Sequence, residues 1–268
     1  MFKQVLSATR PARYWIDEIT FKSSPVRNQL KELKDAYAGK PLLVVGNGPS
    51  LNNTPLDEFS NIPAIGMNKI DLLFDRVNWR PSMIVCINNL VIKQHWRSFV
   101  QSQIPVYLSW KGRWFVKRKF RGKVNYFLDL KSPEFSTELP NGIGMGGTVT
   151  YSALQIAYYM GANPVILFGV DHNFAFKGKP LEYSKRTGAD SNHFDPNYFK
   201  EGDWWGLPDL EASEAGYSNA KAMFENDGRR IVDATIGGKL DIFEKVSVSA
   251  AKALCGIEQR STGKMNPK

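Results

Sequence analysis

The chain has 268 residues, 43% hydrophobic and 23% charged, which is the composition of a globular protein with a large core. Its 35 Lys and Arg exceed its 26 Asp and Glu, so the formal net charge is +9. Two cysteines, Cys86 and Cys255, exclude a disulfide scaffold and a four-cysteine zinc site. No apolar run approaches the roughly 18 residues of a membrane span, and residues 1–15 lack the apolar core of a signal peptide. We therefore expect a soluble, cytoplasmic protein.

The chain divides into three parts by composition. These are a polar N-terminal extension, a Rossmann-like domain and a polar tail, at residues 1–40, 41–254 and 255–268. Within the extension, Leu30, Leu33 and Tyr37 share one helical face. This spacing predicts a short amphipathic helix over residues 26–38.

Strands and helices are expected to alternate along the domain. Apolar runs that stop at polar or glycine residues predict buried strands at 41–46, 63–68, 82–87, 104–108, 124–128, 164–168 and 230–232. Helical patterns lie between them at 90–101, 147–160 and 211–225. Residues 172–208 are rich in Gly, Pro, Asn and aromatic residues, as a lid-like loop often is. The fold class is α/β, with a doubly wound, mainly parallel sheet.

The loop Gly46–Leu51, with the sequence Gly-Asn-Gly-Pro-Ser-Leu, follows the first expected strand. Glycines in this place let a phosphate approach backbone amides. However, Leu51 stands in place of the third glycine of a dinucleotide site, and Asn68 in place of the acid about 20 residues further on. We therefore predict a nucleotide or phosphate site that holds no nicotinamide cofactor. A tight strand-to-helix turn without a ligand is the alternative.

Other phosphate and metal motifs are missing from the sequence. It has no Gly-Lys-Ser/Thr P-loop and no Asp-x-Asp pair of the kind that clamps a metal-bound nucleotide-sugar. The histidines His95, His172 and His193 do not have metal-ligand spacing. We expect no metal and no cofactor.

Positive charge is concentrated in the basic segment, residues 110–123 (WKGRWFVKRKFRGK), which has seven cations and no acid. The cations are Lys111, Arg113, Lys117, Arg118, Lys119, Arg121 and Lys123. Subtracting these seven from +9 leaves +2 for the rest of the chain. Cations interleaved with aromatic residues suit an anionic membrane or acceptor surface, and also nucleic acid. A solvated face with no partner is the third interpretation.

Several patches, in this order, resemble the bacterial family 42 sialyltransferases. They are Val44–Leu51, Met67–Asn68, Cys86–Asn88, Gly147–Thr148, Gly169–Asp171 and the later Asp233–Gly238. The sequence is similar to a related group with the Maf-type flagellin-glycosylation proteins and the MptE-like 6-hydroxymethylpterin pyrophosphokinases. The resemblance covers about residues 41–240.

The resemblance implies a metal-independent, inverting glycosyltransferase. Its donor would be a nucleotide-activated sugar, such as CMP-sialic acid or another CMP-nonulosonic acid. The implied donor site is Gly46, Asn47, Gly48, Ser50, Asn68, Asn88, Thr148, Asp171, His172 and Thr235. Neutral amides and backbone N–H groups can hold a phosphate without a metal. The acceptor would be a bacterial surface glycan (lipopolysaccharide or capsule) or its lipid-linked precursor, at the inner face of the plasma membrane. The oligomeric state is left open.

The resemblance also implies a histidine base in the lid. His193 lies 22 residues after Asp171, and a neutral imidazole can take the proton of an acceptor hydroxyl. A loop histidine that only binds a backbone group is the alternative. His172 is expected to line the donor site, and His95 is interpreted as structural.

One departure from the sialyltransferase pattern concerns the leaving phosphate. The family has a tyrosine just after the Gly-x-Asp patch, whereas this chain has His172, Asn173 and Phe174 there. The other candidates in the loop are Tyr183, Tyr198, Lys177 and Lys179.

Two other functions remain open. One is a pterin or nucleoside pyrophosphokinase, which would need Mg²⁺ and acids such as Asp171 and Asp195. The other is a non-enzymatic module that binds nucleotides or nucleic acid through the basic segment.

Overall fold

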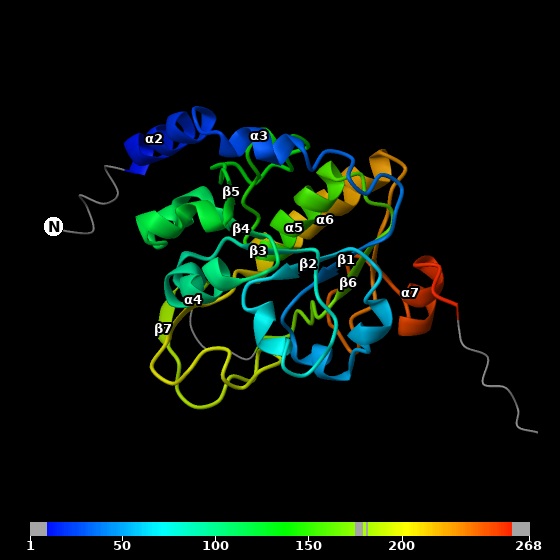
Figure 1. Ribbon diagram of the computed structural model, residues 1–268. Coiled ribbons are helices and arrows are strands. Elements are labelled where there is room, and N and C mark those ends of the chain that lie inside the picture. Colours follow the sequence, from blue (N-terminus) through cyan, green and yellow to red (C-terminus); the bar gives the residue numbers. More distant parts are fainter. Residues whose placement is uncertain (1–9, 175–178, 181, 259–268) are drawn as a thin grey trace, which may run out of the picture.

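An eight-stranded sheet forms the centre of the computed structural model, which describes residues 10–174, 179–180 and 182–258. Every neighbouring pair of strands is parallel, in the order β10-β9-β6-β1-β2-β3-β4-β5 (Figure 1). The strands are β1 (Leu42–Val45), β2 (Ala64–Met67), β3 (Met83–Cys86), β4 (Val106–Ser109), β5 (Asn125–Phe127), β6 (Val165–Phe168), β9 (Ile231–Asp233) and β10 (Glu244–Lys245). The expected α/β fold with a doubly wound parallel sheet is confirmed.

Helices cover both faces of the sheet. They are α2 (Arg10–Lys22), α3 (Val26–Lys31), α4 (Asn89–Gln101), α5 (Val149–Tyr159), α6 (Leu210–Asn226) and α7 (Val248–Leu254). Helices α5 and α6 lie together on one side, and α4 and α7 lie on the other (Figure 1). Because both faces are covered, every residue of β1, β2, β3, β4 and β6 is buried.

The order of the strands reverses next to β1. Strands β2 to β5 follow one another on one side of β1, and β6 then pairs with its other side. Loops that leave two such strands diverge to opposite faces and open a crevice at the carboxyl ends. The loops concerned here are Gly46–Ser50 after β1 and Gly169–Asp171 after β6, so the fold itself brings the two predicted patches together.

The local structure differs from the expectation in two places. The helix expected over residues 26–38 ends at Lys31, because the turns that follow bind the end of α5. There, the N–H groups of Asp35 and Tyr37 donate to the carbonyl oxygens of Tyr159 and Met160.

The second difference lies in the loop over 172–208. It contains an antiparallel pair, β7 (Tyr183–Lys185) and β8 (Trp204–Gly206), outside the main sheet.

The N-terminal helices pack on the domain. Phe21 of α2 and Leu30 of α3 are fully buried in the core. The Nη2 atom of Arg113 donates to Oδ1 of Asp17 over 2.6 Å, and Nε1 of Trp110 donates to Oγ1 of Thr20 over 3.2 Å. Helix α2 is therefore held against the start of the basic segment by apolar packing and a buried ion pair.

A buried carboxyl, Asp129, lies just beyond β5. Its Oδ2 accepts a 2.8 Å hydrogen bond from the hydroxyl of Ser109 and lies 3.9 Å from Nζ of Lys111. Its Oδ1 has no hydrogen-bond partner among the described residues. Burial raises the pKa of Asp129 to about 6, although Lys111 and Ser109 act in the opposite direction.

We predict that Asp129→Asn flattens the pH dependence of stability. The folded-state pKa of about 6 lies above the ordinary 3.8, so the folded protein holds an extra proton between these values. The free energy of unfolding therefore falls as the pH rises through this window, by roughly 3 kcal/mol in all. Urea unfolding below, within and above the window measures this. Exposed Asp241→Asn is the control, and the same slope in wild type and Asp129→Asn would contradict the prediction.

Candidate functional site

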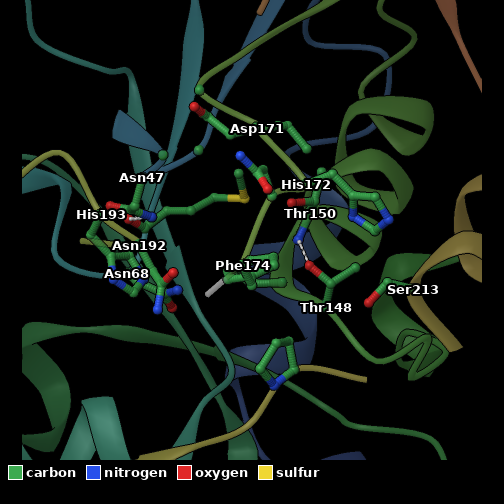
Figure 2. Close-up of a pocket in the computed structure, with 18 of the residues that line it drawn as sticks. Asn47, Asn68, Thr148, Thr150, Asp171, His172, Phe174, Asn192, His193 and Ser213 are labelled. Atoms are coloured by element: carbon green, nitrogen blue, oxygen red, sulfur yellow. Dashed lines mark hydrogen bonds between the residues drawn. The ribbon is translucent and has the colours of Figure 1, made fainter. Parts of the chain in front are cut away.

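A cavity lies at the carboxyl ends of β1, β2 and β6 and faces the first turn of α5 (Figure 2). Its wall includes these predicted site residues: Gly46, Asn47, Gly48, Asn68, Thr148, Asp171, His172 and His193. The structure thus brings together eight residues that are spread over 148 positions of the sequence. The enclosed volume of about 150 Å³ is below the roughly 300–1,000 Å³ of complete ligand sites, so a nucleotide-sized ligand must extend through the open mouth.

The glycines of the loop after β1 are required by packing within the protein. A Cβ atom on Gly46 would overlap the carbonyl oxygen of Gly169, and one on Gly48 would overlap the carboxylate of Asp171. The N–H of Gly48 also donates to the oxygen of Gly169 over 2.9 Å. Packing within the protein is thus enough to require these glycines, and their role in letting a phosphate approach stays a prediction. They make room for the loop after β6.

Asp171 ties the same two loops together. Its Oδ1 accepts from the N–H of Ser50 over 3.0 Å, and its Oδ2 accepts from the hydroxyl of Ser50 over 2.7 Å. Burial raises the pKa of Asp171, while the two bonds from Ser50 oppose the rise. Both carboxylate oxygens are thus occupied by the neighbouring loop.

Two asparagines of the cavity wall have buried side-chain oxygens without a partner among the described residues. The amide nitrogen of Asn47 donates to the carbonyl oxygen of Met67 over 2.9 Å, which fixes the orientation of this side chain. The Oδ1 atoms of Asn47 and Asn68 are buried, and neither has a hydrogen-bond partner among the described residues. Asn68 also has a left-handed backbone, with φ of 52°. Buried acceptors of this kind favour a ligand that donates hydrogen bonds, such as a hydroxyl-rich sugar.

The opposite wall is the start of helix α5. Thr148 is its N-cap, and its hydroxyl accepts from the N–H of Thr150 over 3.3 Å (Figure 2). Thr148, Val149 and Thr150 all line the cavity. Because a helix N-terminus favours negative charge, this wall suits a phosphate or a carboxylate.

His193 is held by a carboxylate and an aromatic ring. Its Nδ1 lies 2.8 Å from Oδ2 of Asp190, so Nδ1 is the nitrogen that donates to this carboxylate. The ring stacks on Tyr198 with 3.8 Å between centroids. Burial would raise the pKa of Asp190, but His193, the N–H of Asn192 and Arg186 together hold it below its usual value. The carboxylate and the ring together fix the orientation of the imidazole.

His172 forms a second histidine–carboxylate pair. Its Nε2 lies 2.8 Å from Oε1 of Glu214 on α6, and its backbone φ is 51°. It lines the cavity beside Phe174, in the place where the sialyltransferase-like pattern has a tyrosine.

Three predicted site residues lie outside the cavity wall. Oδ1 of Asn88 accepts from the N–H groups of Leu90 and Val91 and caps α4. The hydroxyl of Thr235 accepts from the N–H of Val170 over 3.2 Å, and that of Ser50 binds Asp171. These side chains position the backbone around the cavity.

Other predicted residues are also placed by the structure. His95 contacts Asp71 with Nε2 2.8 Å from each carboxylate oxygen and does not line the cavity. Among the candidates for the leaving phosphate, Tyr198 is buried under His193 and Tyr183 is exposed on β7. Lys179 is exposed, and Lys177 lies outside the described residues.

Sequence reasoning missed Asp190 and Lys69. Asp190 precedes His193 by three residues, a spacing that could have been noticed. Nζ of Lys69 donates to the carbonyl oxygen of Tyr198 over 2.7 Å and lies over the Phe199 ring. Burial lowers the pKa of Lys69 despite nearby acids. No motif in the sequence indicated that Lys69 would contact the aromatic residues that pack against His193.

The basic segment needs one correction. Arg113 is buried and paired with Asp17, so it cannot contribute to a membrane or acceptor surface. Lys111 is half-buried near Asp129, with its Nζ 3.8 Å from the centre of the Tyr14 ring. The exposed cations are Lys117, Arg118, Lys119 and Lys123, with Arg121 half-buried beside them.

No group of three or more His, Cys, Asp or Glu residues within the described ranges is arranged to hold a metal ion. Among the described residues that line the cavity, Asp171 is the one carboxylate, and both of its oxygens accept from Ser50.

Comparison with known proteins gives the family. Residues 19–177, more than half of the chain, match the family described as 6-hydroxymethylpterin diphosphokinase MptE-like, and the chain belongs to this family. The expected membership of this group is thus confirmed. No curated protein matches the sequence.

Two solved structures are similar to this chain. The first is the Maf glycosyltransferase from Magnetospirillum magneticum AMB-1, with a TM-score of 0.49 and 15% identity over 84% of this chain. The match spans only 38% of the Maf chain. The second is a mammalian sialyltransferase in complex with Gal-beta-1-3GalNAc-ortho-nitrophenol, with a TM-score of 0.37 and 10% identity, over 85% of this chain and 86% of that one.

We predict that Gly46→Ala and Gly48→Ala lower the midpoint of thermal unfolding, because each new methyl group meets the loop after β6. A cost of about 1–3 kcal/mol is typical of such overpacking. Gly122→Ala is the matched control, because a Cβ there meets no atom within 4 Å. Asn68→Gly, which keeps the left-handed backbone of this position without strain, should instead weaken ligand binding with little loss of stability. Equal thermal midpoints for all three glycine variants would contradict the packing role.

Proposed function

We propose that the chain is a metal-independent, inverting glycosyltransferase. Its donor is a nucleotide-activated sugar, a CMP-nonulosonic acid such as CMP-sialic acid, and its acceptor is a surface glycan or a lipid-linked precursor. The single observation that carries the proposal is the cavity, which combines unpaired amide oxygens, a helix N-terminus and an oriented histidine. The sequence patches that resemble the sialyltransferases support the same donor class.

The chemistry follows from these three features. The unpaired oxygens of Asn47 and Asn68 accept hydrogen bonds from sugar hydroxyls. The N-terminus of α5 lies toward the negative charge of the phosphate or of the sugar carboxylate. Nε2 of His193 takes the proton of the acceptor hydroxyl, whose oxygen attacks the anomeric carbon as the bond to the phosphate oxygen breaks. Asp190 orients the ring and offsets the positive charge that forms on it.

The description of the family favours a second function, a pterin diphosphokinase. Diphosphoryl transfer from ATP uses Mg²⁺ held by carboxylates. The only carboxylate in the described cavity wall is Asp171, whose two oxygens already bind Ser50. We therefore place this function second. A binding module without turnover is the third candidate, because the basic segment also suits nucleic acid.

The donor class is tested by a thermal-shift screen of nucleotides and nucleotide-sugars in EDTA. A ligand that binds only the native state adds about 2.7 kcal/mol at 100 times its Kd, so we expect CMP and CMP-sugars to raise the unfolding midpoint. If ATP raises the unfolding midpoint only in the presence of Mg²⁺ and CMP does not raise it, the diphosphokinase becomes the favoured function. A shift by oligonucleotides alone, lost in salt, would favour the binding module.

We predict that His193→Ala lowers single-turnover transfer by about 10²–10⁴-fold while donor affinity stays nearly constant. The base acts on the acceptor hydroxyl, so nucleotide contacts remain. His95→Ala is the control, and its single-turnover rate should stay close to wild type. His172→Ala should weaken donor binding more than it slows the chemical step. Single-turnover rates and calorimetric affinities separate these effects. A near-normal rate for His193→Ala would exclude it as the base.

Asp190→Asn tests the orientation of His193. An amide can donate to Nδ1 and so favour the wrong tautomer, and we expect a large loss of rate at unchanged donor affinity. Because the two residues act as a unit, the double variant with His193→Ala should be no slower than His193→Ala alone. If the fold losses in rate of the two single variants multiply in the double variant, Asp190 acts independently of His193.

A further inference from the structure

Helix α2 exposes an apolar side that no described part of the chain covers. Its inner side is occupied by Asp17 and Phe21, which pack on the domain. Its outer side presents Trp15, Ile16 and Ile19, with Trp15 65% exposed. The solvent side of a surface helix is ordinarily polar. Three large apolar residues within two turns therefore indicate a partner.

A second exposed tryptophan lies beside this helix. Trp114, 63% exposed, belongs to the 3-10 helix Trp110–Trp114 against which α2 packs. Ile16 and Trp114 line the same groove of about 760 Å³, together with Tyr14 and Phe115. We name Trp15, Ile16, Ile19 and Trp114 the apolar ridge. It accounts for four of the seven large hydrophobic side chains exposed in the described part of the chain.

Unpaired cations lie next to the apolar ridge. Within the described ranges, none of the five outward cations of the basic segment forms an ion pair with an acid; they are Lys117, Arg118, Lys119, Arg121 and Lys123. The guanidinium carbon of Arg121 lies 5.3 Å from the centre of the Trp114 ring, so charge and apolar surface meet there. In Figure 1, α2 and the basic segment, drawn in green, lie on the same side of the molecule.

We infer that this combined surface docks on an anionic lipid bilayer. Tryptophan and isoleucine enter the interfacial region of a bilayer while cations meet the anionic headgroups. Nucleic acid fits less well, because isoleucine does not stack on bases as aromatic residues do. A symmetric dimer through this surface would bring two sets of five unpaired cations together. No described helix is long and apolar enough to cross a bilayer, so binding is at the surface.

The position of the docking surface relates it to the cavity. This relation rests on the proposed function. The groove is lined by Asn89, just after β3, and by Lys111, just after β4. It therefore lies at the carboxyl edge of the sheet, as does the cavity after β1, β2 and β6. A bilayer docked here presents lipid-linked acceptors to the edge that holds His193.

The test is cosedimentation of the full chain with vesicles of phosphatidylcholine alone or mixed with phosphatidylglycerol. We expect binding to the anionic vesicles that falls with salt. Replacing Lys117, Arg118 and Lys119 with Gln should lower the partition coefficient by about a hundredfold, since each cation contributes about fivefold. Ile19→Asn combined with Trp114→Ser should lower it at least tenfold. Matched Ile236→Asn, at a site 41% exposed against 43% for Ile19, should leave it unchanged.

Three results would overturn the inference. They are equal binding to neutral and anionic vesicles, full binding by the Ile19→Asn and Trp114→Ser variant, and displacement from vesicles by oligonucleotides. The three substituted cations are exposed, and so are Ile19, Trp114 and Ile236, so circular dichroism should show the wild-type fold for every variant. Calorimetry with CMP in the absence of vesicles tests the proposed function separately. Normal CMP binding without vesicle binding would refute only the docking surface.

Discussion

The contact between the loop after β1 and the loop after β6 determines the shape of the whole site. Gly46 and Gly48 lie so close to Gly169 and Asp171 that no side chain fits between them. The bonds from Ser50 to Asp171 lock the contact. Strands β1 and β6 are neighbours because the order of the strands reverses next to β1. The contact between the loops that follow these two strands therefore determines where the crevice opens. Asn47, carried on the same loop, is thereby directed toward Met67 at the end of β2.

The polar side chains of the site fall into two groups, those that already have hydrogen-bond partners within the protein and those that have none among the described residues. Asp171, Ser50, Asn88 and Thr235 have their hydrogen-bonding capacity used in holding loops and helix ends. By contrast, the oxygens of Asn47 and Asn68 are buried and unpaired. A buried, unpaired acceptor costs stability, typically about 1–3 kcal/mol, which a ligand with hydroxyl donors recovers on binding. In the function that we propose, these acceptors would favour a hydroxyl-rich ligand over a bare phosphate, and the helix N-terminus would favour negative charge.

The strands and the class of the fold could be predicted because they depend on local patterns. A strand buried on both faces is largely apolar, and the short runs at 41–46, 63–68 and 164–168, each bounded by Pro, Gly or a polar residue, fit this pattern. The use of each polar side chain could not be predicted in the same way. Asn88 has the position of a ligand residue in sequence, but it caps a helix. Arg113 has the appearance of a surface cation, but the fold of α2 places Asp17 against it. The partner of Arg113 lies 96 residues away in the sequence, whereas Asn88 accepts from N–H groups two and three residues further on, so its role as an N-cap was open to local prediction.

The two histidine–carboxylate pairs of the cavity have similar geometry but differ in the exposure of the carboxylate. His193 and His172 both lie 2.8 Å from a carboxylate oxygen. The side chain of Asp190 is 1% exposed, whereas that of Glu214 is 54% exposed. Water screens the charge of Glu214, so it can do little to offset a proton gained by His172. Asp190 is shielded from solvent, and Tyr198 fixes the plane of the His193 ring, so the orientation and the compensating charge are both built in before an acceptor binds. Of two pairs with equal distances, the buried one therefore fits the proton transfer that we propose for His193, and the exposed one fits the lining role that we predict for His172.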